Sequence, residues 1–421
     1  MHDRRDHPGI PQTEQLGSLI YGSVDSGAKF VWNEDFHEKL SKAASELHLK
    51  EHGIVDGAGD AHKVWLPVEC KGILGSDSRT YLLDLVRLTP HDPNLVARAP
   101  AAGSGAAAGV ECGGVLRSEL LERYVSENKL ESFRVNVNIP SSAVSAVGCA
   151  ASSRPWKLAG EKQEVEDDEE QVRKVGKYLV EEVIPGLVQQ FRTLEVSPLD
   201  GRHLRDVMHT HGVNVRYLGA VHAAASMHQV EYVRVLCERE MLARGLKHVL
   251  RQGLSRTGPS HLAASCAHVL NCLLGRVSPP RADKQKKKRA DERAGSGGGV
   301  MVGWAAAAVV DAKGPLGALC SQSLWAALCR EVAARYQFEL PQDRQEALAR
   351  VGAMPLLRSA CQAAGIQIRA RQLDLCAAHP LSSNDIMGLQ PVAKGSIFHC
   401  KEGQLLLSQV KSRVKGSMAA Q

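Results

Sequence analysis

The sequence predicts an α+β protein, with an N-terminal α/β portion that contains a β-hairpin and a mainly α-helical remainder. Residues 64–88 alternate apolar and polar side chains on both sides of a turn, which is typical of a β-hairpin. Between residues 172 and 274 the apolar side chains recur instead with helical period. Within that region, Ser197–Val221 predicts two helices joined by a glycine corner.

Composition limits the class of protein. A chain of 421 residues has room for two or three domains, and 44% hydrophobic with 23% charged residues is typical of a soluble globular protein. No apolar run is long enough to span a bilayer, and the first residues lack the apolar core of a signal peptide. We therefore expect a cytoplasmic protein without a transmembrane segment.

Cysteine and charge usage narrow the function classes further. The eleven cysteines include no C-x-x-C pair, which favours reduced core residues over a disulfide framework. Residues 1–150 hold 15 Lys or Arg against 20 Asp or Glu, a net charge of −5, so the remainder carries +11 of the total of +6. The basic remainder permits an anionic partner such as RNA.

The first predicted elements are a strand, a turn and a helix. The spacing of Gly22, Gly27 and Lys29 is close to that of a phosphate-binding loop, but Ala28 separates the second glycine from the lysine and Phe30 replaces the hydroxyl residue that would hold Mg²⁺. A strand and turn is the better interpretation. Asn33 then caps a helix with an apolar stripe at Phe36, Leu40, Ala43, Ala44 and Leu47.

The predicted hairpin follows. Its strands bury one face, made of Val68, Cys70 and Leu74 and, on the return, Tyr81, Leu83 and Leu85. Gly72 inside the first strand indicates a bulge or a close backbone approach. Glu69 and Asp84 could suggest an acid/base pair, but carboxylates on exposed strand positions are usually solvated.

Low-complexity and charged stretches divide the chain. Residues 97–114 are rich in Ala and Gly and are expected to be a disordered insertion. The expected organisation is an N-terminal part at 1–133, a linker at 134–163, a helical domain at 164–280, a basic Gly-rich linker at 281–299, a second part of that domain at 300–396 and a tail at 397–421.

The glycine corner is the most consistent local signal. Asp200-Gly201 is a turn that leads into a helix over residues 202–211. Gly212 is placed to end that helix with positive φ, and Asn214 to cap the next one, whose apolar stripe is Val215, Leu218 and Val221.

Further helices are predicted on both sides of the corner. The first starts in the acidic run 164–170 and is kinked or broken at Pro185. Others are expected over 230–254, 262–274, 321–336 and 356–364, followed by a short strand at 366–368 and a short helix near Asn384.

The basic linker contains the candidate RNA-contacting residues, which are Lys284, Lys286, Lys287, Lys288 and Arg289. Three interpretations remain open: a solvated loop, non-specific contact with RNA phosphates, and a nuclear-localisation signal.

Other site classes find little support. His203, His209, His211, His222 and His228 cluster in the sequence, but a zinc site needs ligands that converge, and His209 and His211 point to different faces of a helix. A DNA-reading helix would need exposed base-contacting side chains, whereas the helix after the corner is mostly apolar. No catalytic motif, metal set or cofactor fingerprint is present, so we expect no enzyme, no cofactor and no DNA partner.

Several motifs, in order along the chain, resemble the clustered mitochondria (Clu) family, whose yeast relative was described as a subunit associated with translation initiation factor three. They include Glu69-Cys70-Lys71-Gly72-Ile73, Asp92-Pro93-Asn94, Ile184-Pro185-Gly186-Leu187-Val188, Gly212-Val213-Asn214-x-Arg216-Tyr217-Leu218-Gly219 and Leu270-Asn271-Cys272. The residues that carry the resemblance as structural positions are Glu69, Gly72, Asp84, Asp200, Gly201, Gly212, Asn214 and Arg216.

The resemblance implies the end of a Clu domain, to about residue 133, followed by a helical central domain. It also implies a non-enzymatic cytosolic scaffold that binds mRNAs of nuclear-encoded mitochondrial proteins and is needed for the normal distribution of mitochondria. The expected partners are mRNA and the ribosome or translation initiation machinery; a protein-interaction module with no direct RNA contact is the alternative. The earlier N-terminal sequence and the C-terminal tetratricopeptide array of the family are expected to be absent.

Overall fold

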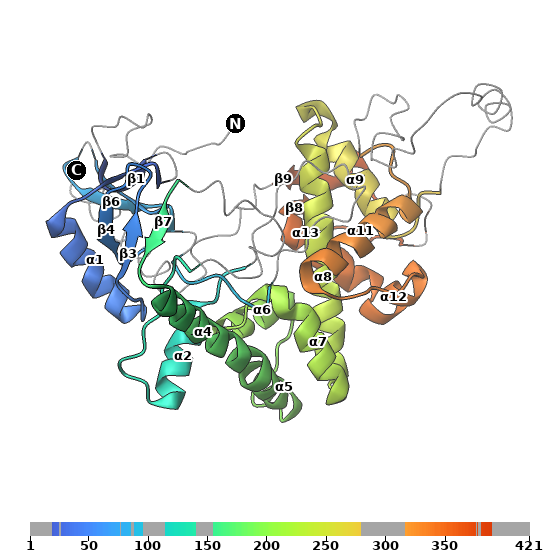
Figure 1. Cartoon of the computed structure of the whole chain (residues 1–421). Helices are drawn as coiled ribbons and strands as arrows, with labels where there is room; N and C mark the ends of the chain where they lie inside the picture. Colours follow the sequence, from blue (N-terminus) through green and yellow to red (C-terminus); the bar gives the residue numbers. More distant parts are fainter. Residues whose placement is uncertain are drawn as a thin grey trace, which may run out of the picture.

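The computed structural model describes residues 19–24, 27–75, 77–85, 88–95, 114–139, 155–278, 316–375, 377 and 380–389. In this part of the chain, the N-terminal strands form two sheets, and most of the remaining elements are helices (Figure 1). The predicted α+β fold class is confirmed.

Two antiparallel sheets form the N-terminal part. The first has the order β2-β1-β5-β6 and the second the order β4-β3-β7. Helix α1 (Glu34–Glu46) lies between β2 and β3 in the sequence. The strands are β1 (Leu19–Val24), β2 (Lys29–Val31), β3 (His52–Val55), β4 (Ala61–Val64), β5 (Lys71–Leu74), β6 (Thr80–Leu83) and β7 (Lys157–Ala159).

The strand-and-turn interpretation of residues 19–31 is confirmed, because β1 and β2 pair as an antiparallel hairpin. The predicted cap of α1 is confirmed too: the Asn33 side chain accepts a hydrogen bond from the Phe36 backbone N–H at 2.9 Å. That helix places Phe36 beneath Gly72 of β5, where a Cβ atom would lie 2.7 Å from the ring. The close approach expected at Gly72 is therefore present.

The β5–β6 hairpin is confirmed, but its predicted buried face is correct only at the start. Val68 and Cys70 are buried, whereas Leu74 is 44% exposed and its neighbour Ile73 is buried instead. The reason is a turn before the strand, in which the Cys70 N–H donates to the Pro67 carbonyl. Strand alternation therefore starts only at Lys71, and its phase differs from the one predicted.

The segment 134–163, predicted as a linker, contributes to the fold at both of its described ends. Asn136 donates to the Asp168 carboxylate of α4 (Lys162–Tyr178) at 3.0 Å, and Asn138 lies 2.6 Å from the Nε2 atom of His52. Farther along, β7 adds a third strand to the second sheet by pairing with β3. Short strands whose partners lie about a hundred residues away leave little periodic signal in the sequence.

The described residues that flank the Ala-rich insertion lie side by side. His91 and Val115 form an antiparallel bridge, and the Asp92 N–H donates to the Gly114 carbonyl at 2.8 Å. The predicted insertion itself, 97–114, lies outside the described residues except for Gly114. Helix α2 (Ser118–Asn128) follows immediately.

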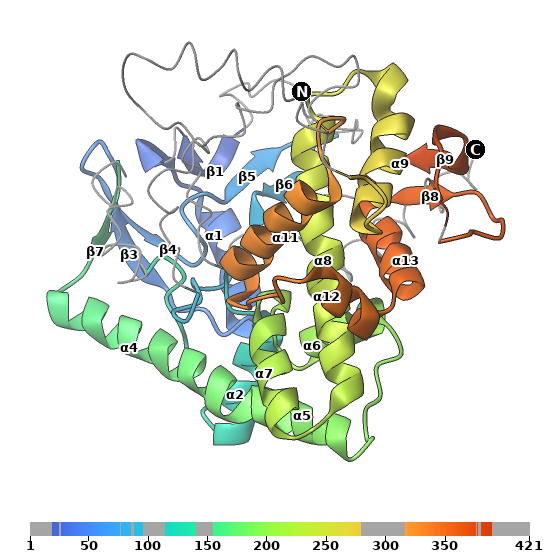
Figure 2. The same ribbon diagram turned by 90° about the vertical axis from the view of Figure 1, so that its right-hand side faces the viewer.

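The helical part is built around α8, which contacts α6, α7, α11, α12 and α13 along its length (Figure 2). The helices are α4 (Lys162–Tyr178), α5 (Ile184–Arg192), α6 (Gly201–Thr210), α7 (Leu218–Met227), α8 (Glu231–Leu254), α9 (Leu262–Leu273), α11 (Ser321–Tyr336), α12 (Arg344–Val351) and α13 (Ala353–Ala364), with a 3-10 turn at Pro259–His261. The sequence predicted most of these helices, but not α12.

A π-helical turn, Leu179–Val183, joins α4 to α5 without interrupting the helix. Pro185, which was expected to kink or break it, stands in the first turn of α5. Since proline has no N–H to donate, the wider turn before it accommodates the missing bond. The apolar residues Leu179 and Val183 stay buried through this change.

Helix α6 begins as predicted. The Asp200 side chain accepts a hydrogen bond from the His203 N–H at 2.7 Å, which is an N-cap. Gly201 packs directly against the carboxylate of Glu240 on α8, which a Cβ atom would overlap unless the Glu240 side chain moved. The start of α6 is thereby fixed against the middle of α8.

The end of α6 confirms the left-handed glycine. Gly212 has φ +77°, its N–H donates to the His209 carbonyl at 2.9 Å, and the Val213 N–H donates to the Met208 carbonyl at 2.8 Å. These two bonds make a Schellman motif. A Cβ on Gly212 would lie 2.6 Å from the backbone of Leu120, so the corner also packs against α2.

The second helix of the corner is capped by Asn214, whose side chain accepts from the Arg216 N–H at 3.0 Å. It starts with a 3-10 turn, Val215–Tyr217, and continues as α7. The Arg216 side chain lies against Gly114, at the exit of the Ala-rich insertion. The corner thus contacts α2, α8 and the insertion boundary.

The C-terminal described residues form a short hairpin. The predicted strand β8 (Ile366–Ile368) is confirmed and pairs with β9 (Ile386–Leu389). The helix expected near Asn384 is only a 3-10 turn, Ser383–Asp385, because β9 begins directly after it.

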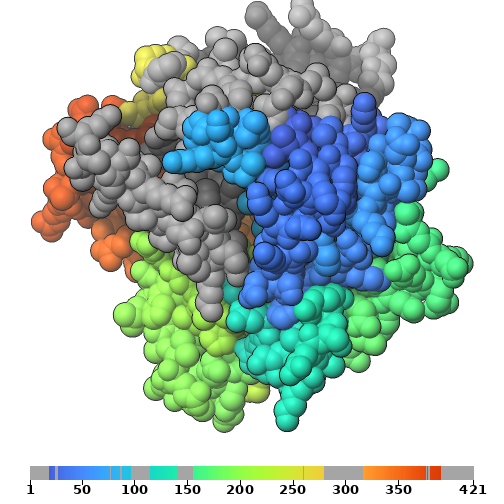
Figure 3. Space-filling view, turned by 90° about the vertical axis from the view of Figure 1, so that its left-hand side faces the viewer, coloured from blue at the N-terminus to red at the C-terminus, as the bar shows by residue number. Residues whose placement is uncertain are grey.

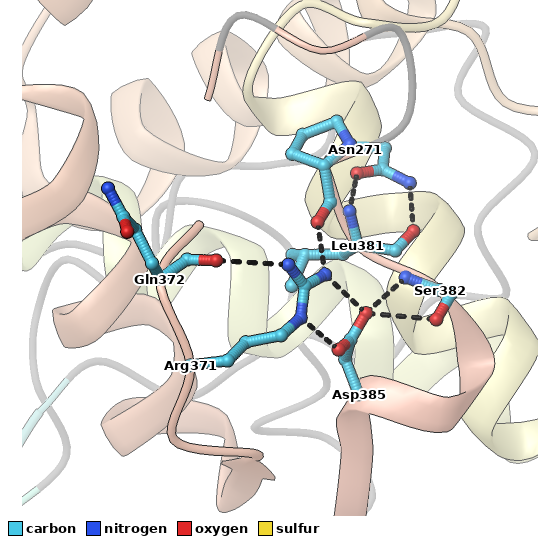
Figure 4. A network of polar contacts seen from close by, with 7 residues as sticks. Asn271, Arg371, Gln372, Leu381, Ser382 and Asp385 are labelled. Carbon is cyan, nitrogen blue, oxygen red and sulfur yellow. Dashed lines mark hydrogen bonds and ion pairs between the residues drawn. The ribbon is translucent and has the colours of Figure 1, made fainter. Parts of the chain in front are cut away.

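A polar network holds this hairpin to α9 (Figure 4). The Asn271 side chain donates to the Leu381 carbonyl at 2.8 Å and accepts from its N–H at 3.1 Å. Arg371 grips the Asp385 carboxylate with two nitrogens at 2.6 and 2.9 Å, and Ser382 donates to the same carboxylate. These bonds keep the pKa of Asp385 well below its usual range, led by the Arg371 side chain.

One continuous core links the two parts of the chain. It runs from Tyr21 and Phe36 of the sheet part through Leu120 to Leu246 of α8. The space-filling view shows the N-terminal strands and α1 lying directly on α2 and α4 (Figure 3). Val135, Val137 and Trp156, from the segment expected to be a linker, belong to this core.

Candidate nucleic-acid interface

The sheet part and the helical part meet at a buried polar junction. The Tyr217 hydroxyl donates to the Asp92 carboxylate, and Asn94 donates from its amide to the Gly176 carbonyl at 2.8 Å and to the Tyr217 oxygen at 3.1 Å. Pro93 packs against Gly176, where a Cβ would lie 2.5 Å from its ring. The motif Asp92-Pro93-Asn94 therefore joins α4 to the glycine corner.

Two family-motif residues of the sheet part, Glu69 and Asp84, carry the carboxylates that could suggest an acid/base pair. Glu69 lines a small hollow together with Thr89, His91 and Trp156. Asp84 has φ +60°, and its backbone carbonyl accepts a weak hydrogen bond from the Cys70 thiol at 3.6 Å. Both carboxylates lie close enough to Cys70 to act on its thiol, whose pKa is raised first by burial and then by Glu69 and Asp84.

Positive charge gathers where α6 lies on α8. Arg244, Lys247 and Arg251 recur on α8 with spacings of three and four residues and so share one face of that helix. The contact between Gly201 and α8 brings Arg205, one turn along α6, to the same face. We call Arg205, Arg244, Lys247 and Arg251 the α6–α8 basic cluster.

The positive charges of this cluster act on one another. The pKa of Lys247 is lowered by burial first and then by the positive charges of Arg244, Arg251 and Arg205. Glu240 partly compensates, since its carboxylate lies 2.6 Å from the Nε atom of Arg244.

Lys247 and Arg251 carry positive charges that no described carboxylate neutralises. Arg205 pairs with its neighbour Asp206, but within the described residues no carboxylate lies within salt-bridge distance of Lys247 or Arg251. Lys247 is half-buried and Arg251 is exposed. A half-buried lysine surrounded by arginines favours an anion, because an anion would relieve the repulsion among them.

The sequence did not single out this cluster. Its α8 residues lie in a stretch that reads as an ordinary amphipathic helix, and Arg205 is some forty residues away in the sequence. The available signal was the recurrence of cations at positions 244, 247 and 251, which fall on one helical face. The candidate residues Lys284, Lys286, Lys287, Lys288 and Arg289 lie outside the described residues.

The histidines of the corner do not converge. His222 is buried and pairs with Glu238 at 2.9 Å, His211 contacts Gln190 at 2.9 Å, and His203 and His228 are exposed. Among the described residues, no three His, Cys, Asp or Glu side chains are grouped so that they could hold a metal ion. None of the described helices combines the length and apolar character needed to cross a membrane.

Comparison with known proteins matches both parts of the chain. Residues 6–95 match the family model "Clustered mitochondria", and residues 195–375 match "Translation initiation factor eIF3 subunit 135". No solved structure matches the chain.

Relatives align over nearly all of it. The Clustered mitochondria protein of Arabidopsis thaliana is 32% identical over 98% of this chain and 33% of its own length. The homologue of Dictyostelium discoideum is 26% identical over 92% of this chain and 31% of its own length. The chain thus spans about a third of the length of the curated relatives it matches.

Fold and matches together define an α+β protein in which a Clu-type sheet region is packed onto helices of the eIF3 subunit 135 type. The chain belongs to the clustered mitochondria family.

Proposed function

We propose that the chain is the RNA-contacting part of a non-enzymatic cytoplasmic scaffold that binds mRNAs of nuclear-encoded mitochondrial proteins and serves the normal distribution of mitochondria. The names of its relatives support the mitochondrial role. The α6–α8 basic cluster is the observation that carries the RNA contact.

The cluster suits a phosphate backbone better than a single small anion. Three cations along α8 extend over two helical turns, a length of roughly 10 Å, which exceeds one phosphate group. Contacts to successive phosphates release counterions and need no defined base sequence. The cluster therefore supplies affinity, and sequence preference would have to come from elsewhere.

The basic linker is a second proposed contact. Lys284, Lys286, Lys287, Lys288 and Arg289 follow α9 in the sequence and would add contacts of the same non-specific kind. The proposal includes the domain division at residues 133, 163, 280 and 299. In that division the basic linker is an insertion within one helical domain.

The alternative is a protein-interaction module of the translation initiation machinery with no direct RNA contact. The match of residues 195–375 to an initiation-factor subunit favours this alternative. In that case the cluster would hold an acidic protein surface.

RNA binding is tested by gel shift with a single-stranded RNA between about 50 and 200 mM salt. We expect the double variant Lys247→Gln, Arg251→Gln to weaken binding and to reduce the slope of log K against log salt by about 1.4, which corresponds to two phosphate contacts. Arg234→Gln is the matched control, since Arg234 lies on the same helix but pairs with Glu231. A slope unchanged by the double variant would reject the cluster as the contact.

A second arm separates RNA from protein. Changing the five linker cations to Gln measures the linker's own share of the salt slope. Pull-downs with and without nuclease then show whether translation factors are held through RNA. Retention that survives nuclease but is lost in the Lys247→Gln, Arg251→Gln variant would favour the protein-interaction alternative.

A further inference from the structure

The N-terminus of α11 is capped by a cysteine. The Sγ atom of Cys320 accepts from the Ser323 N–H at 3.4 Å, and the Ser323 hydroxyl accepts from the Cys320 N–H at 2.9 Å. This reciprocal arrangement is a capping box in which sulfur takes the place of the usual oxygen. Thiolates are favoured at such positions by the N–H donors and the helix dipole.

A second thiol lies beside this cap. Cys272 of α9 places its Sγ atom 3.4 Å from the Leu319 carbonyl oxygen and 3.6 Å from the Nε2 atom of His268. Peptide geometry sets that oxygen about 3 Å from the Cα atom of Cys320. The Cys272 sulfur therefore lies within about 6 Å of the Cα atom of Cys320, and the two thiols are neighbours.

We propose that Cys320 and Cys272 are a peroxide-responsive thiol pair, in which Cys320 is oxidised first and Cys272 closes a disulfide between α9 and α11. The pKa values of the two thiols differ in the direction that this order of oxidation requires. Burial acts to raise the pKa of Cys320, but hydrogen bonds led by those from Ser323 bring it below its ordinary value. Burial and the neighbouring Cys320 raise the pKa of Cys272 to about 12, so it stays a thiol.

The chemistry needs hydrogen peroxide or another hydroperoxide as the oxidant. The Cys320 thiolate attacks one peroxide oxygen, so that an S–O bond forms, the O–O bond breaks and hydroxide leaves, to be protonated to water. The Cys272 sulfur then attacks the sulfenic sulfur; the S–S bond forms, the S–O bond breaks, and the second water leaves with the Cys272 proton. Two thiols are oxidised and one peroxide is reduced to two waters.

Disulfide formation would change the helix that Cys320 caps. Movement of the Cys320 side chain towards Cys272 would take its sulfur away from the Ser323 N–H, and α11 would lose this N-cap contact. Since α11 packs on α8, where Leu328 and Val332 contact Gly245, oxidation would act on the same helix that carries the basic cluster.

The chain offers a matched control pair. Cys266 of α9 neighbours Cys361 of α13, and Cys361 is 7% exposed against 9% for Cys320. Neither thiol of the control pair caps a helix. Burial first, and then Cys266, raise the pKa of Cys361 to about 12.

The test is peroxide treatment of the full chain, alkylation of the remaining thiols and tryptic mass spectrometry without reduction. Trypsin releases Cys272 and Cys266 in residues 257–276, Cys320 in residues 314–330 and Cys361 in residues 359–369. We expect 257–276 linked to 314–330. Cys272→Ser and Cys320→Ser should abolish this product, whereas Cys266→Ser and Cys329→Ser should retain it.

Two results would overturn the proposal. One is a link between 257–276 and 359–369 that forms as fast as the expected one, since burial alone would then account for reactivity. The other is the absence of any link to 314–330 when the chain, shown to be folded by circular dichroism, is oxidised. Trapping of the Cys272→Ser variant with a sulfenic-acid probe should label Cys320, and labelling of Cys361 instead would also contradict the assigned order.

Discussion

The hydroxyl of Tyr217 lies 2.9 and 2.8 Å from the two carboxylate oxygens of Asp92, although 125 residues separate them in the chain. Asp92 is 2% exposed, and burial raises its pKa to about 6 despite the opposing effect of Tyr217. The junction between the sheet part and the helical part therefore contains a carboxyl group that ionises near physiological pH.

Asp92→Asn should remove a pH dependence of stability. Because the folded-state pKa is raised, the contribution of Asp92 is full below about pH 3.8 and is lost as the pH rises through about 6. The amide can still accept from Tyr217, so the variant should gain up to about 3 kcal/mol relative to the parent between pH 4 and 7. Urea unfolding across this range measures the difference. Asp167→Asn, at an exposed position, should show no such trend.

His52 should act in the opposite direction. Burial lowers its pKa to about 4, and it is held neutral between the Lys50 carbonyl and the Asn138 amide. The unfolded chain then binds the extra proton, so stability is lost as the pH falls from about 6.5 towards 4. We expect His52→Gln to be less stable at pH 7 but to lose less stability over that window. An unchanged acid limb in urea titrations would show that other groups dominate.

Gly212→Val should destabilise the fold severely. The residue has φ +77° and its Cβ would overlap the Leu120 backbone, so we expect a cost above about 2 kcal/mol. Gly186→Ala is the matched control, because it lies within α5 with open space at its Cβ position and should be neutral or stabilising by up to about 1 kcal/mol. Thermal unfolding of both variants checks this. Equal stability of Gly212→Val and the parent would contradict the packing against α2.

Asn271→Ala should release the C-terminal hairpin from α9. The substitution leaves the buried N–H and carbonyl of Leu381 without their partner, at a cost of about 2–4 kcal/mol. Hydrogen exchange should show faster exchange at Leu381 and in β9. The exposed Asn384→Ala, in the neighbouring 3-10 turn, should change stability by less than about 0.5 kcal/mol.

Features set by neighbouring residues were predictable from the sequence. The caps at Asn33 and Asp200 and the Schellman glycine at Gly212 each depend on a few adjacent positions, and all three are present. The positions of α8 and α11 follow equally from the helical period of their apolar residues.

Features set by distant partners were not predictable. β7 pairs with β3, which lies about a hundred residues earlier in the sequence. The contact between Asp92 and Tyr217 likewise produces no periodic pattern in the sequence. The α6–α8 basic cluster is of the same kind, because it exists only once Gly201 has brought α6 against α8. The resemblance to a family supplied the fold that such distant contacts build, but it did not identify the residues that contact a partner.

The bridge between His91 and Val115 has a consequence for how the chain can vary in length. The described residues on either side of the Ala-rich stretch meet at this bridge, so doubling the length of chain between them would add only about 0.6 kcal/mol of closure entropy. Shortening, lengthening or replacing it with a fluorescent reporter should leave the surrounding packing in place. The same site therefore offers a place to attach a label for following the protein in cells.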